Sequence, residues 1–524
     1  MKLVLLVIIL SFSVLSAWVI TKRGIISWGA NGAGTDNAFA TRVVKAGDDL
    51  QAAINRAQPG DILEIEAGAV FKGPFILPVK TGNAFITIQS SRLSELPPSG
   101  SRVNPSHAHL MAKVVAVSPQ PAISTAPKAH HYRFIGIEFL PLDKTRATAD
   151  LIRLGDGSAE QNSPELVAHD LILDRCYIHG HPGQEVKRGV ALNSAETEIL
   201  NSYISDIHGE GYDTQAICGW NGPGPFHIIN NHLEAAGENV MFGGADPAIA
   251  NLIPSDIEIR GNYFVKPLSW KKDDPSYAGR HWSVKNLFET KNARRVLVDG
   301  NLFENCWVDA QVGFAILLKS NNQDNKCPWC VTEDLVFSNN IVRNVEHGLN
   351  ILGYDIGKTS GQARRIRVVN NLWENINGMW FQGTDGADDI LIEHNTHFQG
   401  EGNIFTLYGK PTTGFVYRYN VTLRTGYGVK GDGTGEGRKA LEAFCPGYVF
   451  TKNVIAGVSS ADYPPGNFYP TSLQEIGFVD LANHNYRLSS KSRYSKAAPN
   501  RKDLGCDFDA LGPALQARSG EHLG

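Results

Sequence analysis

The sequence predicts an all-β protein, a single-stranded right-handed parallel β-helix whose stacked coils begin with a short capping helix. Three observations predict this fold. A short apolar strand ending in a polar-Asn-apolar step recurs along the chain, a second set of apolar segments precedes those strands, and an amphipathic segment stands before the first coil. Strands alternate with Gly/Asn turns rather than helices, which disfavours a doubly wound fold.

The recurring step places an Asn at one position of each unit, as in IINNHL at 228–233 and LVFSNNIV at 335–342. The two shortest spacings, 24 and 25 residues, suit one coil of three short strands and are too short for a propeller blade. Stacked coils bring equivalent residues to about 4.8 Å. We therefore expect each Asn to take the left-handed turn conformation and to bond to its copies above and below. The positions are Asn231, Asn262, Asn301, Asn340, Asn371, Asn395, Asn420 and Asn453, with Ser202 and Cys176 equivalent in earlier coils.

Residues 42–490 are the predicted solenoid. Apolar residues at helical spacing within 48–68 predict the capping helix, which Pro59-Gly60 ends. We expect loop insertions at about 91–117, 265–285 and 320–331, and a C-terminal tail over 491–524.

Residues 1–24 have the pattern of a secretory signal peptide: Lys2, an apolar run and then Ser16-Ala17. Because apolar residues continue to Ile20, a membrane anchor is the alternative. Residues 25–41 are a predicted linker. Either pattern predicts a secreted, periplasmic or cell-surface protein, with membrane contact only if the segment is retained. We expect a monomer.

Charge and cysteine content narrow the class further. The net charge of −4 and the lack of a basic stripe argue against nucleic-acid binding. Cys327 and Cys330 form a C-x-x-C pair, which predicts a small loop disulfide in an oxidising compartment, with a redox or metal motif as the alternative.

The helix followed by Pro59-Gly60-Asp61 and the Asn-marked coils resemble the pectate-lyase-like superfamily of right-handed β-helices, over roughly residues 42–490. That resemblance implies the fold. It leaves activity open, because the superfamily includes lyases, hydrolases, esterases, epimerases and non-catalytic surface proteins.

The segments before the Asn-marked strands, such as NLFETK at 286–291 and FAILLKS at 314–320, predict a second column whose C-terminal ends share one face. Aromatic rings stack on sugars and cations hold uronates, so an acidic polysaccharide is the expected partner. The expected substrate-binding residues, some from the 265–285 insertion, are Arg280, His281, Trp220, Trp282, Tyr354 and Tyr408. For Trp282, packing of the insertion onto the helix is an equal alternative to sugar stacking.

Lys291, Lys319 and Glu289 are the candidate catalytic residues. Two ammonium groups one coil apart lower each other's pKa and would give a base near neutrality, while Glu289 orients a lysine or binds a cation. The alternative is that both lysines are solvated strand ends. Glu238 and Asp246 are candidate Ca²⁺ ligands, or simply turn residues.

The stretch FETKNARRVLVDGN also resembles the alginate-lyase and chondroitinase-B family of β-helix lyases. That resemblance implies Lys291 as the base, acidic calcium ligands, and Lys319 in place of an Arg, although Lys lacks the bidentate fork of Arg. We expect a lyase that cleaves a uronate-containing glycan by β-elimination. The alternatives are a glycoside hydrolase that uses Asp355 and Asp385, and a non-catalytic carbohydrate-binding solenoid.

Overall fold

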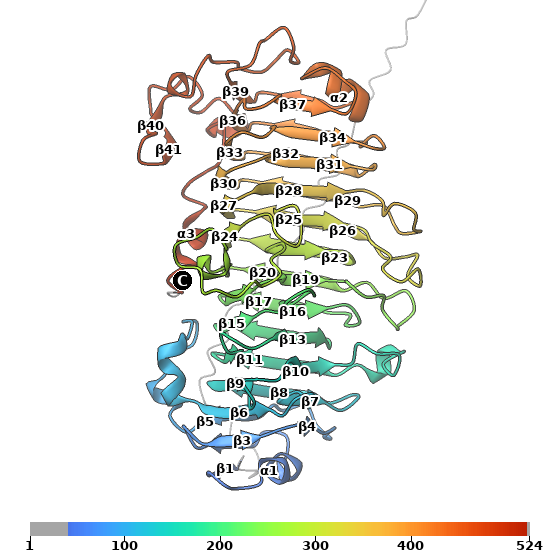
Figure 1. The fold of residues 1–524 in the computed structure, drawn as a ribbon, viewed down its shortest axis with the longest axis vertical. Helices are drawn as coiled ribbons and strands as arrows, with labels where there is room; N and C mark the ends of the chain where they lie inside the picture. The colour runs from blue at the N-terminus through green and yellow to red at the C-terminus, as the bar shows by residue number, and fades with distance from the viewer. Residues whose placement is uncertain (1–39, 521–524) are drawn as a thin grey trace, which may run out of the picture. The chain divides into compact units, whose positions relative to one another are not determined.

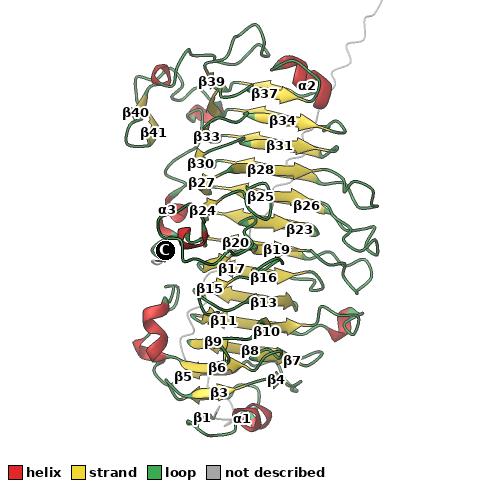
Figure 2. Cartoon of the chain, in the orientation of Figure 1, coloured by secondary structure: helices red, strands yellow, loops and turns green. Residues whose placement is uncertain are grey.

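The computed structural model describes residues 40–520, and these form a solenoid of three long parallel sheets (Figures 1 and 2). Each complete coil adds one strand to sheet A, then to sheet B, then to sheet C. Parallel strands joined in this way coil in the right-handed sense. The predicted fold is therefore confirmed.

Within each sheet, strands from successive coils lie side by side in chain order. Sheet A contains β1 (Thr41–Val44), β2 (Ile62–Ile65), β5 (Ile86–Ser90), β8 (His130–Ile135), β11 (His169–Asp174), β14 (Thr197–Leu200), β17 (Phe226–Ile229), β20 (Ser255–Arg260), β23 (Ala293–Asp299), β26 (Thr332–Ser338), β29 (Arg364–Val369), β32 (Asp388–Glu393), β35 (Val416–Arg418) and β38 (Val449–Thr451). Sheet B contains β3 (Val70–Lys72), β6 (Ala112–Ala116), β9 (Ile137–Pro141), β12 (Tyr177–His179), β15 (Tyr203–Ile207), β18 (His232–Ala235), β21 (Tyr263–Val265), β24 (Leu302–Cys306), β27 (Ile341–Val345), β30 (Leu372–Ile376), β33 (Thr396–Gln399), β36 (Val421–Leu423) and β39 (Val454–Ala456). Sheet C contains β4 (Phe75–Leu77), β7 (Ile123–Thr125), β10 (Thr148–Gly155), β13 (Val186–Asn193), β16 (Gln215–Gly219), β19 (Glu238–Phe242), β22 (Phe288–Thr290), β25 (Phe314–Lys319), β28 (His347–Leu352), β31 (Phe381–Thr384), β34 (Phe405–Tyr408) and β37 (Val429–Gly431).

Short helices cover the first coil and extend the loops. The predicted cap is α1 (Leu50–Arg56), which buries Leu50 and Ile54 and whose N-cap Asp49 accepts a hydrogen bond from the Ala52 N–H. At the other end of the solenoid α2 (Arg438–Phe444) packs beside β37. Helix α3 (Gly512–Gln516) lies near the C-terminus. The 3₁₀ helices span Leu93–Glu95, Pro105–Leu110, Pro164–Leu166, Leu268–Trp270, Gln474–Ile476 and Pro499–Arg501.

The Asn repeat is a continuous hydrogen-bonded ladder at the turn from sheet A to sheet B. Each Asn side-chain oxygen accepts the backbone N–H of its equivalent in the previous coil at 2.8 to 3.0 Å, from Asn231 to Asn453. Ser202 precedes the ladder as predicted, since its N–H donates to Asn231 and its hydroxyl accepts from Cys176 N. Asn467 extends the ladder by one further step.

One detail of the expected turn was wrong. The left-handed residue is the one before each ladder Asn, as at Asn230, Gly261 and Lys452 with φ of 54°, 62° and 53°. The amide of each ladder Asn can therefore lie along the stack, where its Nδ2 donates to the side-chain oxygen of the Asn in the next coil.

The remaining interior is mainly apolar and includes a stack of aromatic rings. Phe264, Phe303, Phe337 and Trp373 follow one another in successive coils with centroids 4.3, 5.5 and 5.6 Å apart. Outside the coils, Cys327 and Cys330 form the predicted loop disulfide.

The C-terminal region packs back onto the solenoid. Regular coils end at β39, and the antiparallel hairpin β40 (Phe478–Asp480) and β41 (Asn485–Leu488) follows. Leu511 and Ala514 then pack against Leu302 and Ile341 on the outer face of sheet B, where Figure 1 shows α3 beside β24. The predicted signal or anchor (1–24) and nearly all of the predicted linker lie outside the described residues, and in residues 40–520 no helix is long and apolar enough to cross a membrane.

We expect Asn340→Ala to lower the free energy of unfolding by at least about 2 kcal/mol, because buried groups left without partners cost roughly 1–3 kcal/mol each. The substitution removes the acceptor of Asn301 N–H and the donor to Val298 O. Denaturant unfolding measures the change. Asn483→Ala is the control, since this exposed Asn bonds only to Asp480. Equal stability of the two variants would contradict the prediction.

Candidate functional site

The predicted second column is sheet C. Its neighbouring strands β16, β19, β22, β25, β28, β31 and β34 contain all the segments from which the column was inferred. Lys319 ends β25 and Tyr408 ends β34, while Trp220, Lys291 and Tyr354 follow their strands within two residues. The C-terminal ends of these strands therefore lie side by side on sheet C, as expected.

The three candidate catalytic residues lie together. Glu289, in the middle of β22, is fully buried, and its Oε1 lies 3.0 Å from Lys319 Nζ and 3.6 Å from Lys291 Nζ. Its Oε2 accepts a hydrogen bond of 2.8 Å from Asn286 Nδ2. Glu289 pairs with Leu317 across β22 and β25, which sets Lys319 one coil beyond Lys291.

The carboxylate between the two ammonium groups reverses the expected effect on the pKa of Lys291. Burial lowers this pKa, but Glu289 and then Glu238 raise it by more, so the net shift is upward. For Glu289, burial raises the pKa and the two lysines lower it by more. The expectation that the pKa of Lys291 is lowered was therefore wrong, because it left out the effect of the Glu289 charge on that pKa.

A second buried acid stands in the preceding coil. Glu238 begins β19, accepts a 2.8 Å hydrogen bond from Gln215 Nε2 and lies 4.0 Å from Lys285 Nζ. Burial, and then the charges of Glu289 and Asp213, raise the pKa of Glu238 to about 7. The site thus contains one firmly ionised carboxylate and one that titrates near neutrality.

Several buried oxygens in these coils have no hydrogen-bond donor. They include Oε1 of Gln215, Oε1 of Glu238 and Oδ1 of Asn286. Oε1 of Glu289 has no aligned hydrogen-bond donor either, but it forms ion pairs with the two ammonium groups. Gln215 pairs with Glu238 across β16 and β19, and Asn286 lies at the equivalent position before β22. Carboxylate and amide oxygens are the ligands that Ca²⁺ takes. Sequence reasoning missed Gln215 and Asn286, because neutral amides have no charge pattern and only strand register places them.

The other predicted metal ligand lies elsewhere. Glu238 begins β19, whereas Asp246 lies in the loop after the end of that strand. Because the five residues of β19 span roughly 13 Å, the two acids are at opposite ends of the strand. Its Oδ2 accepts hydrogen bonds from the backbone N–H groups of Asp324 and Lys326, at 2.9 and 2.8 Å. The structure thus uses Asp246 to hold the loop after β25 and does not bring it to Glu238.

The predicted substrate-binding residues of the 265–285 insertion mainly form contacts that hold the insertion against the rest of the protein. Trp282 is 2% exposed, and its ring packs on His208 at 3.8 Å and under the Arg280 guanidinium at 4.3 Å, which leaves no room for a sugar. Arg280 Nε donates to Glu210 at 2.6 Å. His281 is largely exposed and pairs with Asp309 at 2.6 Å.

Trp220 lies by a cavity of about 330 Å³ on the outer face of sheet C. The guanidinium of Arg188 sits 4.9 Å from its ring centroid, and its Nε1 donates to Gly157 O. Asp150 pairs with both Arg188 and Arg153 at this cavity. Arg188 was missed at the sequence level, because β13 precedes the coils in which the Asn repeat is regular.

Tyr354 and Tyr408 stand on the far side of the lysines. Lys410 Nζ lies 5.3 Å from the Tyr354 ring centroid, and Tyr408 is 38% exposed. The acids considered for a hydrolase follow β28 and β31. Asp355 accepts a hydrogen bond from Asn321, and Asp385 takes a left-handed backbone conformation with φ of 52°.

Comparison with known proteins gives structural likenesses only, since no family profile and no curated protein matches the sequence. A mannuronic acid specific polysaccharide family 6 lyase from human gut microbiota aligns at 13% identity and TM-score 0.43, over 83% of this chain and 92% of its own. A GH87 α-1,3-glucanase catalytic unit from Streptomyces thermodiastaticus strain HF3-3 aligns at 11% and 0.45, over 85% and 72%. Pectate lyase Pel9A aligns at 12% and 0.36, over 89% and 96%. Likenesses this distant assign no activity to the chain.

We expect Glu289→Gln to destabilise the protein by roughly 3–5 kcal/mol at neutral pH, because it leaves buried ammonium groups without their counter-charge. The pKa of Glu289 is lowered in the folded state, so its contribution is complete above the ordinary pKa of Glu and is lost as pH falls through the lowered value.

Unfolding measured from neutral to acid pH tests this expectation. The gap between wild type and Glu289→Gln should close in acid, where the wild-type carboxyl is also neutral. Glu442→Gln, at an exposed Glu 4.0 Å from Arg438, should show no comparable gap at any pH. A gap that stays constant into acid would refute the assigned ionisation.

Proposed function

We propose that the protein is an exported polysaccharide-active enzyme, a lyase that cleaves a uronate-containing glycan by β-elimination. The observation that carries the proposal is the pair of ammonium groups, Lys291 and Lys319, held around the buried carboxylate of Glu289 on the outer face of sheet C. The two ammonium groups are cations that can bind the carboxylate of an acidic sugar. The cavity at Trp220 and Arg188 offers a ring and a cation on the same sheet.

The chemistry requires a base and charge neutralisation. A base removes the C5 proton of the uronate, the C4–O bond breaks as the C4=C5 double bond forms, and the leaving oxygen takes up a proton. In this proposal Lys291 is the base and Lys319 holds the uronate carboxylate, with Glu289 orienting both. Because the pKa of Lys291 is raised, little of the free base exists at neutral pH in the free protein.

The buried carboxylate and amide oxygens of these coils fit a calcium ion as part of the same proposal. Gln215, Glu238, Asn286 and Glu289 would hold it, which matches the preference of Ca²⁺ for oxygen ligands. Bound there, the ion supplies positive charge that neutralises a uronate carboxylate. The same carboxylates are those that raise the pKa of Lys291.

Export is supported by two independent features. The pattern of residues 1–24 is that of a signal peptide or anchor. The loop disulfide between Cys327 and Cys330 belongs in an oxidising compartment.

Uronate polymers treated with the protein should yield unsaturated products that absorb ultraviolet light. We expect Lys291→Ala to reduce kcat/KM by roughly 10²–10⁴-fold, the usual contribution of a general base. Because the pKa of Lys291 is raised, kcat/KM of the wild type should rise with pH into the alkaline range.

The matched control is Lys430→Ala, which removes a lysine from β37 on the same sheet, beside Tyr427 and four coils beyond Lys319. Its kcat/KM should equal that of the wild type. Release of reducing sugar without ultraviolet absorbance would contradict the lyase assignment and indicate a glycoside hydrolase. Binding of the glycan without any turnover would contradict both enzyme assignments and indicate a non-catalytic carbohydrate-binding solenoid.

Calcium should raise the melting temperature of the wild type, because an ion that binds only the folded state stabilises it. Glu238→Gln removes one charged ligand and should weaken this shift. Glu442→Gln should leave it unchanged. A calcium shift that is identical in the wild type and Glu238→Gln would exclude this oxygen set as the site.

A further inference from the structure

A second column of polar residues lies at the start of the sheet A strands, just after the turns that leave sheet C. In most coils one residue there takes a left-handed conformation, with φ between 43° and 59°. We call this column the corner ladder. Its members are His131, Asp170, Glu196, Asp256, Arg295, Asp334, Arg365 and Asp389.

In the later coils the corner ladder is made of opposite charges. Arg295 bonds to both carboxylate oxygens of Asp256 at 2.6 Å, and Arg365 bonds to both of Asp334 at 2.5 and 2.9 Å. The coils of β8 and β11 differ. Within residues 40–520, Asp170 forms ion pairs with two imidazoles and with no Lys or Arg side chain.

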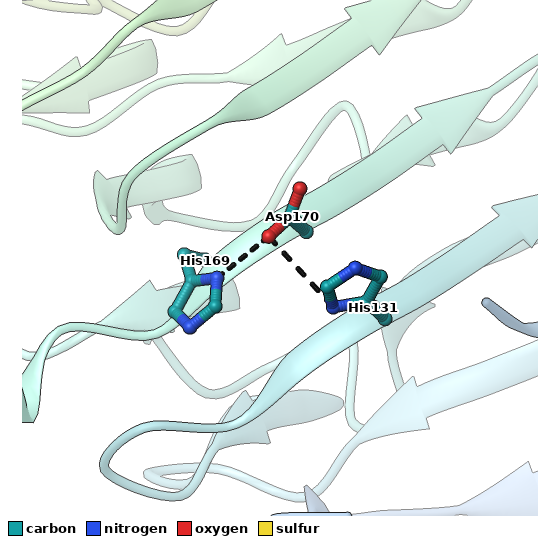
Figure 3. Close-up of side chains that lie close together, drawn as sticks. All are labelled: His131, His169 and Asp170. Carbon is teal, nitrogen blue, oxygen red and sulfur yellow. Dashed lines mark hydrogen bonds and ion pairs between the residues drawn. The ribbon is translucent and has the colours of Figure 1, made fainter. Parts of the chain in front are cut away.

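The left-handed turns bring these side chains together. Successive strand residues normally point to opposite faces. In the pairing of β8 with β11, His130 pairs with His169 and Tyr132 with Leu171, whereas the left-handed residues His131 and Asp170 between them are not paired. Figure 3 shows His131, His169 and Asp170 directed toward one another from β8 and β11.

The distances suit a shared ion. Asp170 Oδ2 lies 2.6 Å from His169 Nδ1 and 3.7 Å from His131 Nδ1. This is the one group of three His, Cys, Asp or Glu residues in the described chain whose ligand atoms all lie within 4.8 Å of one another. Tetrahedral ligands of zinc stand about 3.3 Å apart, given Zn–N bonds of about 2.0–2.1 Å, and the two distances to Asp170 lie on either side of this value.

Two further groups, His130 and Glu196, border the three residues. His130 Nδ1 lies 2.8 Å from His131 Nδ1, and the His130 ring stacks on His169 with centroids 4.9 Å apart. The side chains of His131, His169 and Asp170 are 15, 39 and 25% exposed, so an ion can reach them from solvent.

We propose that His131, His169 and Asp170 bind a divalent transition-metal ion, best matched by Zn²⁺, which joins two successive coils of the solenoid. Two imidazoles and a carboxylate are ligands for zinc, and three protein ligands leave a fourth position for water or His130. The donor set differs from the oxygens around Glu238, which suit calcium. The site does not depend on the proposed lyase activity.

The test is calorimetric titration of ZnCl₂ into the full chain without an affinity tag. The wild type should bind one zinc ion at these residues, and excess calcium should not displace it. His131→Ala, His169→Ala and Asp170→Asn should each weaken binding by more than about tenfold, since loss of even an outer-shell partner costs 10–100-fold.

His227→Ala is the matched control. His227 also lies on sheet A, in β17, and its Nδ1 contacts one carboxylate, Glu258, at 3.1 Å. Its zinc affinity should equal that of the wild type. Circular dichroism and the metal-free melting temperature of each variant establish that the fold is retained.

A wild type that binds no zinc would overturn the proposal, and so would variants at residues 131, 169 and 170 that keep wild-type affinity. In either case the three side chains would be only a hydrogen-bonded step of the corner ladder. Asp170→Asn keeps the size of the side chain, so it tests the ligand charge even if the alanine variants fail to fold.

Discussion

Hydrogen bonding between successive coils is the constraint on which the rest of the structure depends. Each strand pairs in parallel with its equivalent one coil away, and the Asn ladder satisfies the buried polar groups at the turn from sheet A to sheet B. An unmade bond there would leave several buried donors and acceptors unpaired at once. The register of every coil is therefore fixed. Loop insertions change only the number of residues between equivalent positions of successive coils.

Because the register is fixed, residues at equivalent positions of successive coils are stacked in columns. Charged residues far apart in the sequence therefore lie next to one another. Glu289, Lys291 and Lys319 meet because one coil separates β22 from β25. The corner ladder arises in the same way, with Asp and Arg in alternate coils. Each column sets its own electrostatics. Glu289 raises the pKa of Lys291, whereas the corner ladder places two imidazoles beside Asp170.

The fold could be predicted because its signal is a repeat, which survives variation at any one position. Lys291, Lys319 and Glu289 could be grouped for the same reason. Gln215 and Asn286 could not, because they differ from ordinary polar strand residues only in their buried, unpaired oxygens. The two alternatives for Trp282 could not be separated, because composition alone does not tell whether a ring contacts a sugar or packs on His208. Asp246 was misjudged because a strand separates it from Glu238.

The returning C-terminal segment alters how such a solenoid can come apart. In a repeat protein each unit contacts only its neighbours, so the ends can open independently of the middle. In this chain Arg102 Nη1 donates to Ala517 O at 2.7 Å, joining residues 415 positions apart, and the segment leading to it packs across coils from β21 to β30. The last residues of the described chain thus act as a strap along one side of the stack, which couples the opening of the final coils to that of the early ones.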